Sequence, residues 1–396
     1  MKILFAILFV SNLVAFNFNF DIPPAREEIM EPSVLGEQVA PKKRVEKKKI
    51  TIENIDIKEF DDEKEEPKTI YVEHKRSVDI DTSSISYPKI ALIVPRKVIK
   101  KYANSVADSL LSYMINKRGR FELELFDCGD ESERSIVNKL DEIRSRGFRL
   151  VIAPMTQRGA RVIAKNESSL IVYIPTVNKK EVPLQSDNIF FGGIDYEEQI
   201  DKLLTYAGDR VAIFNDKSAL SQKIASFVKN AAFSDISYEM QIRNAKVNLA
   251  PYIKNNHKLD HASIFLNMPI VKTSLLASQL SVYDSKYKNM LLTQIAFNPL
   301  IFTLTQKKDR ENMYIANSIG KSEFNLKDIN LILGTNIDYS WVNYSTVFGV
   351  DYFYTNFIYD TKRKSFDEKM VNNQVSYKIE LLKPGSSRFE KIRSNF

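Results

Sequence analysis

Short apolar runs alternate with amphipathic stretches from residue 89 to residue 299. The clearest runs cover residues 90–95, 150–154, 211–216 and 263–267, and each ends in a polar or proline-containing loop. Apolar runs of this length, separated by helical patterns, are typical of strands that are covered on both faces. The pattern therefore predicts βαβ units and parallel sheets, whose ligands bind at the carboxyl ends of the strands.

Periodicity and helix signals predict two similar βα units in series. In the first unit we expect helices over 98–116, 131–146 and 156–165, and further strands over 121–126, 149–153, 170–174 and 189–191. In the second we expect helices over 196–206, 219–231, 249–255 and 271–283, with strands over 210–214, 236–242, 262–266 and 290–295. The boundary between the units falls near residue 195.

The C-terminal part departs from this rhythm. Residues 329–334 form an apolar run that predicts a strand or its edge, 345–357 an aromatic helix, and 374–382 a half-buried strand with alternating apolar positions. The chain must then return to the earlier layers after Pro299. We expect two Rossmann-like α/β lobes with parallel sheets: 88–194 plus about 300–358 in lobe 1, and 195–299 plus about 359–396 in lobe 2.

The first residues have the pattern of a secretory signal. Met1-Lys2 precedes an almost wholly apolar run over 3–16, too short for a membrane span. We expect a signal peptide over 1–19 and a mature protein in the periplasm. The run has no Cys behind it, so a lipid-anchored N-terminus is not expected, while an uncleaved N-terminal membrane anchor stays open.

Residues 20–87 differ in composition from the rest of the chain. They contain a basic run over 42–49 and an acidic run over 61–66. Such blocks bury too little apolar surface to offset the entropy of the chain, which predicts a disordered, charged tether. The exception is 49–58, whose four isoleucines favour an edge strand or docking on a partner.

Charge and cysteine content narrow the function classes. The chain of 396 residues is long enough for two or three domains, and its net charge of +7 is small for that size. No cluster of basic and aromatic residues accompanies the charge, so we expect no nucleic-acid partner. Cys128 is the single cysteine, so no disulfide forms within the chain.

Several segments together resemble the type I periplasmic binding proteins. Residues 209–216 are similar to the opening strand of that family's second lobe, 261–269 to its third strand, and 348–352 to a late helix that returns through the first lobe. The resemblance covers about residues 88–396 and implies two lobes around a cleft. Residues 151–156 resemble the V-I-G-P-L loop of the envelope proteins that activate penicillin-binding peptidoglycan synthases, although Ala153 replaces the glycine and the lipid-carrying cysteine is missing.

The amino-acid-binding members of the family place hydroxyls at two loops of the first lobe. The resemblance implies that Thr156 and Gln157 at one loop, and Thr176 with Asn178 at the next, hold the carboxylate and ammonium of a ligand. This sequence departs from those receptors, because Lys179-Lys180-Glu181 follows at once and the helix after Asp216 lacks a glycine-rich entry.

Polar residues at the predicted strand ends supply candidate ligand-binding positions in the cleft. These candidates are Arg96, Thr156, Gln157, Thr176, Asn178, Asp216 and Asn267, with Asp195, Asn215 and Asn298 at similar places. For any one of them, the role of a helix cap or turn former is favoured over ligand binding.

The chain shows no motif of an enzyme, a cofactor site or a metal site. Its glycines are single or paired. His74 lies in the expected tether, while His257 and His261 flank a charged turn before a strand, where a surface role is favoured over metal binding. Nine aromatic residues crowd into 339–359, where they fit a core or a protein contact. We expect a non-catalytic periplasmic protein that contacts another envelope protein, with no cofactor; the alternative is a solute-binding receptor for an amino acid or similar small polar ligand.

Overall fold

The computed structural model describes residues 88–392 apart from 118–120, 168, 184–185, 234, 244–247 and 359–363. The expected signal peptide (1–19), the expected tether (20–87) with its isoleucine segment and His74, and Tyr359 lie outside the described residues. Among the described helices, none combines the length and the hydrophobicity that crossing a membrane requires.

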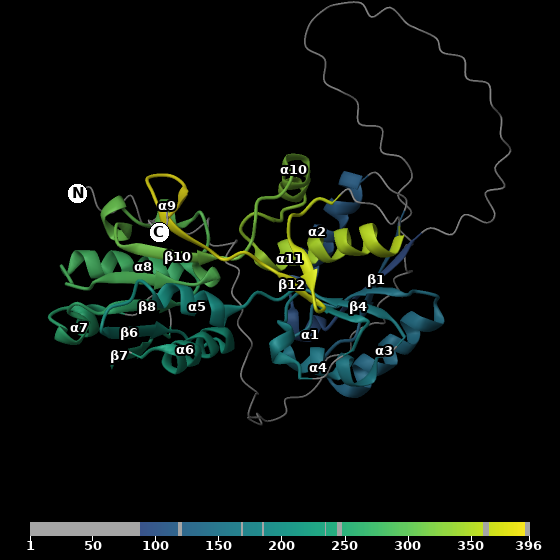
Figure 1. Cartoon of the computed structure of the whole chain (residues 1–396), viewed down its shortest axis with the longest axis horizontal. Coiled ribbons are helices and arrows are strands. Elements are labelled where there is room, and N and C mark those ends of the chain that lie inside the picture. The colour runs from purple at the N-terminus through teal and green to yellow at the C-terminus, as the bar shows by residue number, and fades with distance from the viewer. Residues whose placement is uncertain are drawn as a thin grey trace, which may run out of the picture. The chain divides into compact units, whose positions relative to one another are not determined.

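The first sheet contains seven strands, five from the first βα unit and two from the C-terminal part (Figure 1). Its order is β11-β12-β5-β4-β3-β1-β2, and all neighbours are parallel except β11 and β12. The strands are β1 (Lys89–Val94), β2 (Glu122–Asp127), β3 (Leu150–Ile152), β4 (Ile171–Ile174), β5 (Ile189–Phe191), β11 (Lys369–Val371) and β12 (Gln374–Ser376).

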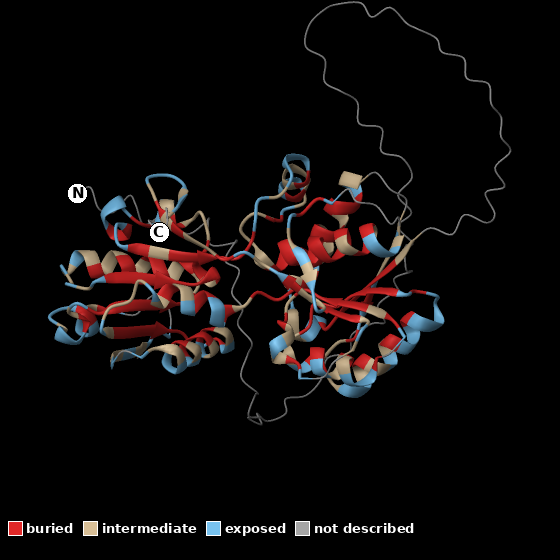
Figure 2. Ribbon diagram, in the orientation of Figure 1, coloured by how far each residue is buried: buried red, intermediate tan, exposed pale blue. Residues whose placement is uncertain are grey.

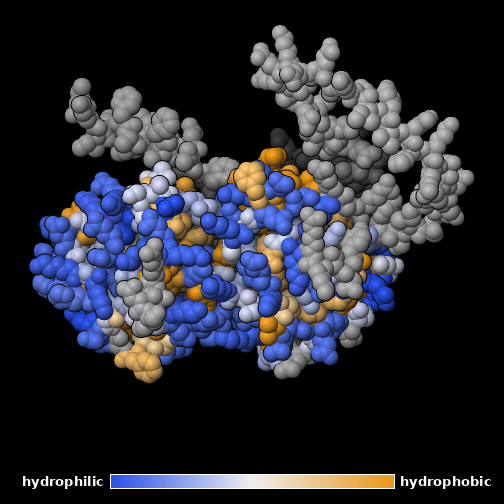
Figure 3. Space-filling view, turned by 45° about the horizontal axis from the view of Figure 1, so that its top comes forward, coloured by the Kyte–Doolittle hydropathy of each residue, from blue (hydrophilic) through white to orange (hydrophobic). Residues whose placement is uncertain are grey.

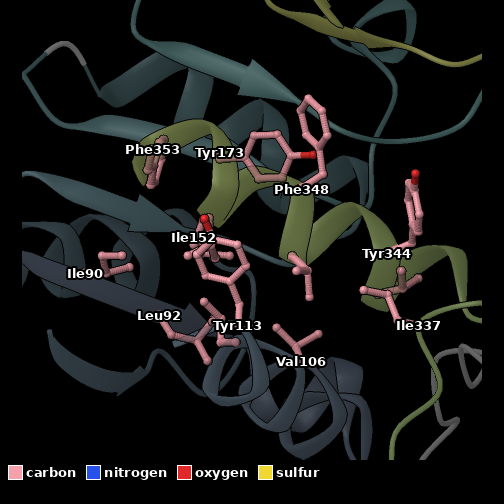
Figure 4. Close-up of a cluster of buried hydrophobic side chains, with 14 of the residues drawn as sticks. Ile90, Leu92, Val106, Tyr113, Ile152, Tyr173, Ile337, Tyr344, Phe348 and Phe353 are labelled. Atoms are coloured by element: carbon pink, nitrogen blue, oxygen red, sulfur yellow. The ribbon is translucent and has the colours of Figure 1, made fainter. Parts of the chain in front are cut away.

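Helices cover both faces of this sheet. Successive residues of a strand point to opposite faces, so the apolar side chains of the central strands are buried under helices on both sides. Ile90 and Leu92 of β1 join the core under α2 (Tyr102–Lys117) and α11 (Trp341–Phe353), whereas Ala91 and Ile93 join the core under α3 (Glu133–Ser145) and α4 (Gln157–Asn166). Figure 4 shows the first core, in which aromatic side chains of α2, β4 and α11 lie together. We call this sheet and its helices lobe 1.

The second sheet repeats the plan with the order β14-β13-β10-β9-β8-β6-β7. Its strands are β6 (Arg210–Asn215), β7 (Asp235–Gln241), β8 (Ser263–Asn267), β9 (Asn289–Leu292), β10 (Met313–Asn317), β13 (Glu380–Pro384) and β14 (Phe389–Lys391). Only β13 pairs antiparallel, with β10 on one side and β14 on the other.

The faces of the second sheet are also covered by helices. One face packs on α5 (Tyr196–Leu204) and α6 (Ala219–Ala231), and the other on α7 (Ala250–Ile253), α8 (Ile270–Val282) and α9 (Ile301–Leu304). In Figure 2 the strands of both sheets are largely buried while the outer faces of the helices are exposed. We call this sheet and its helices lobe 2.

The structure confirms the predicted fold class of two mostly parallel α/β sheets with flanking helices. One predicted element is wrong: most of the expected strand at 329–334 belongs to α10 (Phe324–Ile332), which packs on α2 through Leu326 and Asn330. Those two residues are four apart, and this helical spacing was masked by the apolar residues 331–333. The single strand expected over 374–382 is divided into β12 and β13, which belong to different sheets.

The sheets also divide the C-terminal part differently from the expected lobes. Strand β10 lies inside 300–358, expected in lobe 1, yet it pairs with β9 in lobe 2. Strands β11 and β12 lie inside 359–396, expected in lobe 2, yet β12 pairs with β5 in lobe 1. The reason is that Met313–Asn317 is a fifth parallel strand of lobe 2, so the chain crosses back to lobe 1 only after it.

Candidate functional site

The loop after β3 carries the predicted residue Thr156 at the amino end of α4. Thr156 does not cap its own helix with its side chain. Its backbone N–H donates a hydrogen bond of 2.6 Å to Oε1 of Glu131, and its hydroxyl donates to Oε2 of the same carboxylate. Glu131 is only 4% exposed. Both donors of Thr156 that the sequence offers to a ligand are therefore engaged by the chain itself.

The other predicted residues of lobe 1 that follow β3 and β4 are also engaged internally. Gln157 donates from Nε2 to the carbonyl of Glu181 over 2.9 Å, and the Thr176 hydroxyl donates to the carbonyl of Met155. Asn178 caps the short helix Lys179–Glu181 and donates from Nδ2 to the carbonyl of Gly193 over 3.1 Å. Asn178 thus has the role of a helix cap, and Gln157 and Thr176 connect loops of the lobe.

Arg96 is the predicted residue that is most accessible. It begins the short helix α1 (Arg96–Ile99) directly after β1, and about half of its side chain is exposed. Its Nε lies 3.8 Å from Oδ2 of Asp127, a partly exposed pair that leaves the guanidinium largely in solvent. Arg96 is thus available for a contact but is not enclosed by a site.

Asp216 of lobe 2 is buried and paired. Only 1% of it is exposed, and its Oδ2 accepts a hydrogen bond of 2.7 Å from Nζ of Lys272 in α8. Its Oδ1 accepts from the backbone N–H and the hydroxyl of Ser218, the cap of α6. Burial by itself would raise the pKa of Asp216, but the hydrogen bonds from Lys272 and Ser218 hold it below its ordinary value. Asp216 therefore behaves as a structural carboxylate.

Asn267 at the end of β8 is the exception among the predicted residues. It is fully buried, and within the described residues neither Nδ2 nor Oδ1 has a hydrogen-bond partner. Thr293, which follows the neighbouring strand β9, is equally buried and its hydroxyl is also unpaired there. Buried polar atoms without a partner are uncommon. Asn267 and Thr293 therefore keep polar atoms that are not used by contacts within the described residues.

Two ion pairs lie where the chain passes between the two sheets. Lys223 of α6 in lobe 2 pairs with Glu181 of lobe 1, with each side chain at most one third exposed. Lys180 pairs with Asp195, the cap of α5, and the hydrogen bond that Lys180 donates to this carboxylate raises the pKa of Lys180. The residues 179–181, which the resemblance to receptors did not explain, thus connect elements of both lobes.

Aromatic side chains make a further connection at the start of α11. Tyr339, just before the helix, packs on Phe297 and Phe389 of lobe 2, with ring centroids 5.3 and 6.2 Å away. Trp341 begins α11 and packs against a core of lobe 1 and against one of lobe 2. Of the predicted aromatic cluster, Tyr344, Phe348 and Phe353 are buried in the core of lobe 1.

A cavity of about 610 Å³ lies beside the strands that cross between the lobes. Its lining includes Asn178, Lys180, Asp195, Gln374 and Tyr377. Of the seven predicted ligand-binding residues only Asn178 lines it, together with Asp195 from the additional strand-end positions, and the charged groups of Lys180 and Asp195 are already paired. This cavity therefore does not gather the seven candidates.

The histidines and the cysteine of the described residues do not gather into a cluster of metal ligands. The described residues contain no group of three or more His, Cys, Asp or Glu side chains placed to hold a metal ion. His257 is exposed and pairs with Asp260 three residues on. Cys128 is buried, which raises the pKa of its thiol to about 12.

The sequence did not indicate the role of Glu131, or that residues 181, 223 and 339 connect the lobes. Glu131 is the first residue of a predicted helix, where an acidic residue is ordinary, and no pattern in the sequence marks it as buried. The pairing of Glu181 with Lys223 joins residues 42 apart on different lobes. Only the departure of residues 179–181 from the receptor pattern gave a hint of their role.

Comparison with known proteins shows similarity in structure alone. No protein-family model matches the chain, and no curated protein matches its sequence. The branched-chain amino acid ABC transporter protein from Thermus thermophilus with bound valine superposes with a TM-score of 0.58 at 13% identity, over 78% of this chain and 96% of that chain. The substrate binding protein LivJ from Streptococcus pneumoniae, in complex with isoleucine, gives 0.55 at 10% identity, over 77% and 98%.

A third solved structure, full-length LpoA from Haemophilus influenzae, has a TM-score of 0.51 at 9% identity. The similarity covers 78% of this chain but 59% of LpoA. At these identities the similarity establishes the fold and no more. The resemblance seen in the sequence is confirmed at that level: the chain has the two-lobed fold of the type I periplasmic binding proteins.

Proposed function

We propose that this chain is a non-catalytic protein of the periplasm that uses its two-lobed fold to contact another protein of the cell envelope. The observation that carries the proposal is the engagement of the predicted ligand-binding side chains by the chain itself. Thr156 donates to Glu131, and Asp216 is held by Lys272 and Ser218. A ligand gains affinity from groups that are free to pair with it, and such groups are scarce here.

The connections between the lobes support the same proposal. A receptor that closes on its solute needs lobes that move relative to each other. Here Tyr339 packs on Phe297, and Glu181 pairs with Lys223, so opening would break contacts made without any ligand. A fixed pair of lobes suits a module that presents one surface to a protein partner.

Helix α10 offers the surface for that contact. Phe324, Leu331 and Ile332 are 75%, 50% and 82% exposed on one short helix. Figure 3 shows a face of the chain that is mostly hydrophilic, with hydrophobic residues in scattered patches. Exposed apolar side chains gathered on one element are characteristic of protein contacts. The partner class is an envelope protein such as a peptidoglycan synthase, which the resemblance of residues 151–156 to the synthase activators suggests.

A photo-crosslinking amino acid placed at Phe324 or Ile332 of the full chain tests this function in intact cells. We expect both positions to crosslink the same envelope protein, and the purified partner to lose binding to the double variant Phe324→Asp, Ile332→Asp. The matched control is Val282 on α8, which is 60% exposed in lobe 2. Identical products from position 282, or products from outside the envelope, would contradict the proposal.

The second candidate, a receptor for a small polar solute, is favoured by Asn267 and Thr293. A thermal-shift screen of the twenty amino acids separates the two functions. A ligand at about one hundred times its dissociation constant would stabilise the fold by roughly 2.7 kcal/mol. A stabilising amino acid whose effect disappears in Asn267→Ala would establish the receptor instead.

A further inference from the structure

Three segments of the chain cross between the two sheets, and helix α11 contacts two of them through neighbouring residues. The first segment is 192–195 between β5 and α5, the second is 318–323 between β10 and α10, and the third is 377–379 between β12 and β13. Lobes move relative to each other when a few residues of such segments rotate. The contacts that hold these segments therefore determine whether the lobes can move.

The first segment is held at the carbonyl group of Gly192. The Ser345 hydroxyl lies 2.9 Å from this carbonyl oxygen and 2.9 Å from that of Pro175, and it is 3.0 Å from the hydroxyl of Tyr173. The hydroxyl of Tyr377, in the third segment, donates to the same Gly192 carbonyl over 2.7 Å. Ser345 and Tyr173 are fully buried, so water does not compete for these bonds.

The chain can approach these hydroxyls only because residues 192 and 193 are glycines. A Cβ atom added at Gly192 would overlap the hydroxyls of Tyr173 and Ser345, and one added at Gly193 would overlap the backbone of Val177. Neither glycine is among those with a positive φ. The requirement for glycine thus comes from the close approach of the segment to lobe 1 and not from its backbone conformation.

The second segment is held by the neighbouring residue of α11, Tyr344. A Cβ atom added at Gly320 would lie 2.9 Å from the Tyr344 hydroxyl, so the segment passes directly beside this group. The same hydroxyl donates to Oε1 of Glu368 over 2.7 Å. Figure 4 shows Tyr344 on α11 and Tyr173 beside the same helix. One helix of lobe 1 therefore contacts two of the three connections to lobe 2.

The end of the second segment that joins lobe 2 is fixed as well. The backbone N–H of Ser318 donates to Oε1 of Gln294 over 2.7 Å, and the Ser318 hydroxyl accepts from Nε2 of Gln199 over 2.6 Å. All three residues are at most 3% exposed. Helix α10 begins directly after this segment. The contacts at both ends of the segment thus also fix the position of α10.

We propose that the hydroxyls of Tyr173, Ser345 and Tyr377 around the Gly192 carbonyl form a clamp that locks the two lobes in one orientation without any ligand. The clamp extends the proposed function and rests on it in one respect, because a locked orientation keeps α10 in one place for a protein partner. A solute receptor needs the opposite property, since its lobes close on the ligand.

The test measures the distance between the lobes by double electron–electron resonance on the full chain. Nitroxide labels are attached to Ser145→Cys on α3 in lobe 1 and to Ser226→Cys on α6 in lobe 2, both at exposed positions. The native Cys128 is buried and should stay unlabelled. We expect one narrow distribution of distances, unchanged by any of the twenty amino acids. In the double variant Ser345→Ala, Tyr377→Phe the Gly192 carbonyl loses both donors, so the distribution should widen or divide in two.

The matched control is Thr346→Val, which removes another buried hydroxyl from the same helix. Thr346 donates to the carbonyl of Val342 within α11 and takes no part in the clamp. Its variant should lose stability in thermal unfolding but keep the narrow distribution. Circular dichroism establishes that each variant is folded. Where the double variant does not fold, Tyr377→Phe alone keeps the Ser345 contact and should widen the distribution less.

Three results would overturn the clamp. They are a wild-type distribution that is already wide or divided, a wild-type distribution retained by the folded Ser345 and Tyr377 variants, and equal widening in Thr346→Val. The labels at 145 and 226 lie outside α10, so crosslinking at α10 is decided independently. Mobile lobes together with a crosslinked partner would reject the clamp alone, whereas a narrow distribution without a partner would reject the proposed function alone.

Discussion

Tyr113 of α2 donates a hydrogen bond of 2.8 Å to Oδ1 of Asp351 in α11, although 238 residues separate them. Both side chains are buried, and Ser365 donates from its backbone N–H to the same carboxylate over 3.2 Å. Burial raises the pKa of the Tyr113 hydroxyl, as do the neighbouring charge and hydrogen bond of Asp351. The pair attaches the C-terminal helix to lobe 1 by a polar contact inside an apolar core.

Removing this hydroxyl should destabilise the protein measurably. Tyr113→Phe leaves a buried carboxyl with one donor fewer, and hydrogen bonds to charged groups contribute about 1.5–3 kcal/mol. We expect a loss of that size in the free energy of unfolding, measured by urea denaturation. Tyr252→Phe, at an exposed position, is the matched control and should change stability by less than about 0.5 kcal/mol. Equal losses in both variants would show that the pair contributes little.

Lys272 should be more important for stability than the lysine closest to Asp216 in the sequence. Lys272→Met removes the cation from Asp216, and breaking a buried ion pair from one side costs about 3–5 kcal/mol. Lys217→Met, next to Asp216 but exposed, should cost less than about 0.5 kcal/mol. Chemical denaturation at neutral pH makes the comparison, and similar costs for the two lysines would contradict it.

The lowered pKa of Asp216 also predicts how this difference depends on pH. The stabilisation by the ionised carboxylate is complete above the pKa of unfolded Asp, about 3.9, and is lost as the pH falls through the lower pKa of the folded state. The gap in stability between wild type and Lys272→Met should therefore narrow below about pH 4. Urea denaturation from pH 7 to pH 3 measures it, and a constant gap would argue against the pair.

Trp341 gives a direct readout of movement between the lobes, because it is the one tryptophan of the chain and packs against cores of both. We expect the wavelength of its fluorescence emission maximum to stay the same when any of the twenty amino acids is added. The maximum should shift to longer wavelength when the protein is unfolded. An amino acid that shifts the emission of folded protein, but not that of Asn267→Ala, would support the receptor function instead.

Cys128 should be inert in the folded protein. Burial raises the pKa of its thiol to about 12, so the thiolate fraction at pH 8 is on the order of 10⁻⁴. We expect no rapid reaction with a thiol reagent until the protein is unfolded. Ser226→Cys, exposed on α6, is the positive control within the same chain and should react at once. Rapid labelling of wild type at position 128 would mean that this core opens readily.

The sequence predicts the central strands well because their burial on both faces leaves a continuous apolar run. Runs such as 90–95 and 263–267 appear as β1 and β8, shifted by one residue at most. The prediction from sequence fails where tertiary packing determines the secondary structure. Residues 329–332 are mostly apolar but belong to helix α10, whose buried contacts are made by Leu326 and Asn330. No local pattern distinguished β10, β11 and β14: β10 depends in part on the distant strand β13, and β11 and β14 are three-residue strands at sheet edges that pair only with β12 and β13.

The candidate site was harder to predict from the sequence than the fold, because it depends more on contacts that form only on folding. Strand ends could be found from the sequence, so each of the seven residues lies at or near a predicted loop. What could not be found is what each side chain bonds to, because Thr156 and Asp216 meet Glu131 and Lys272 only after folding. A polar residue at a strand end offers the same donors whether a ligand or the chain itself accepts them.

The pairing of β12 with β5 and of β13 with β10 has a consequence for synthesis of the chain. Each sheet includes a strand that is translated after residue 368, so neither lobe has all its strands until the last few dozen residues have left the ribosome. Contacts between segments so far apart in sequence form slowly, because long loops must close first. The chain must therefore spend its synthesis with two unfinished sheet edges, and a truncation before β12 would leave both of them open.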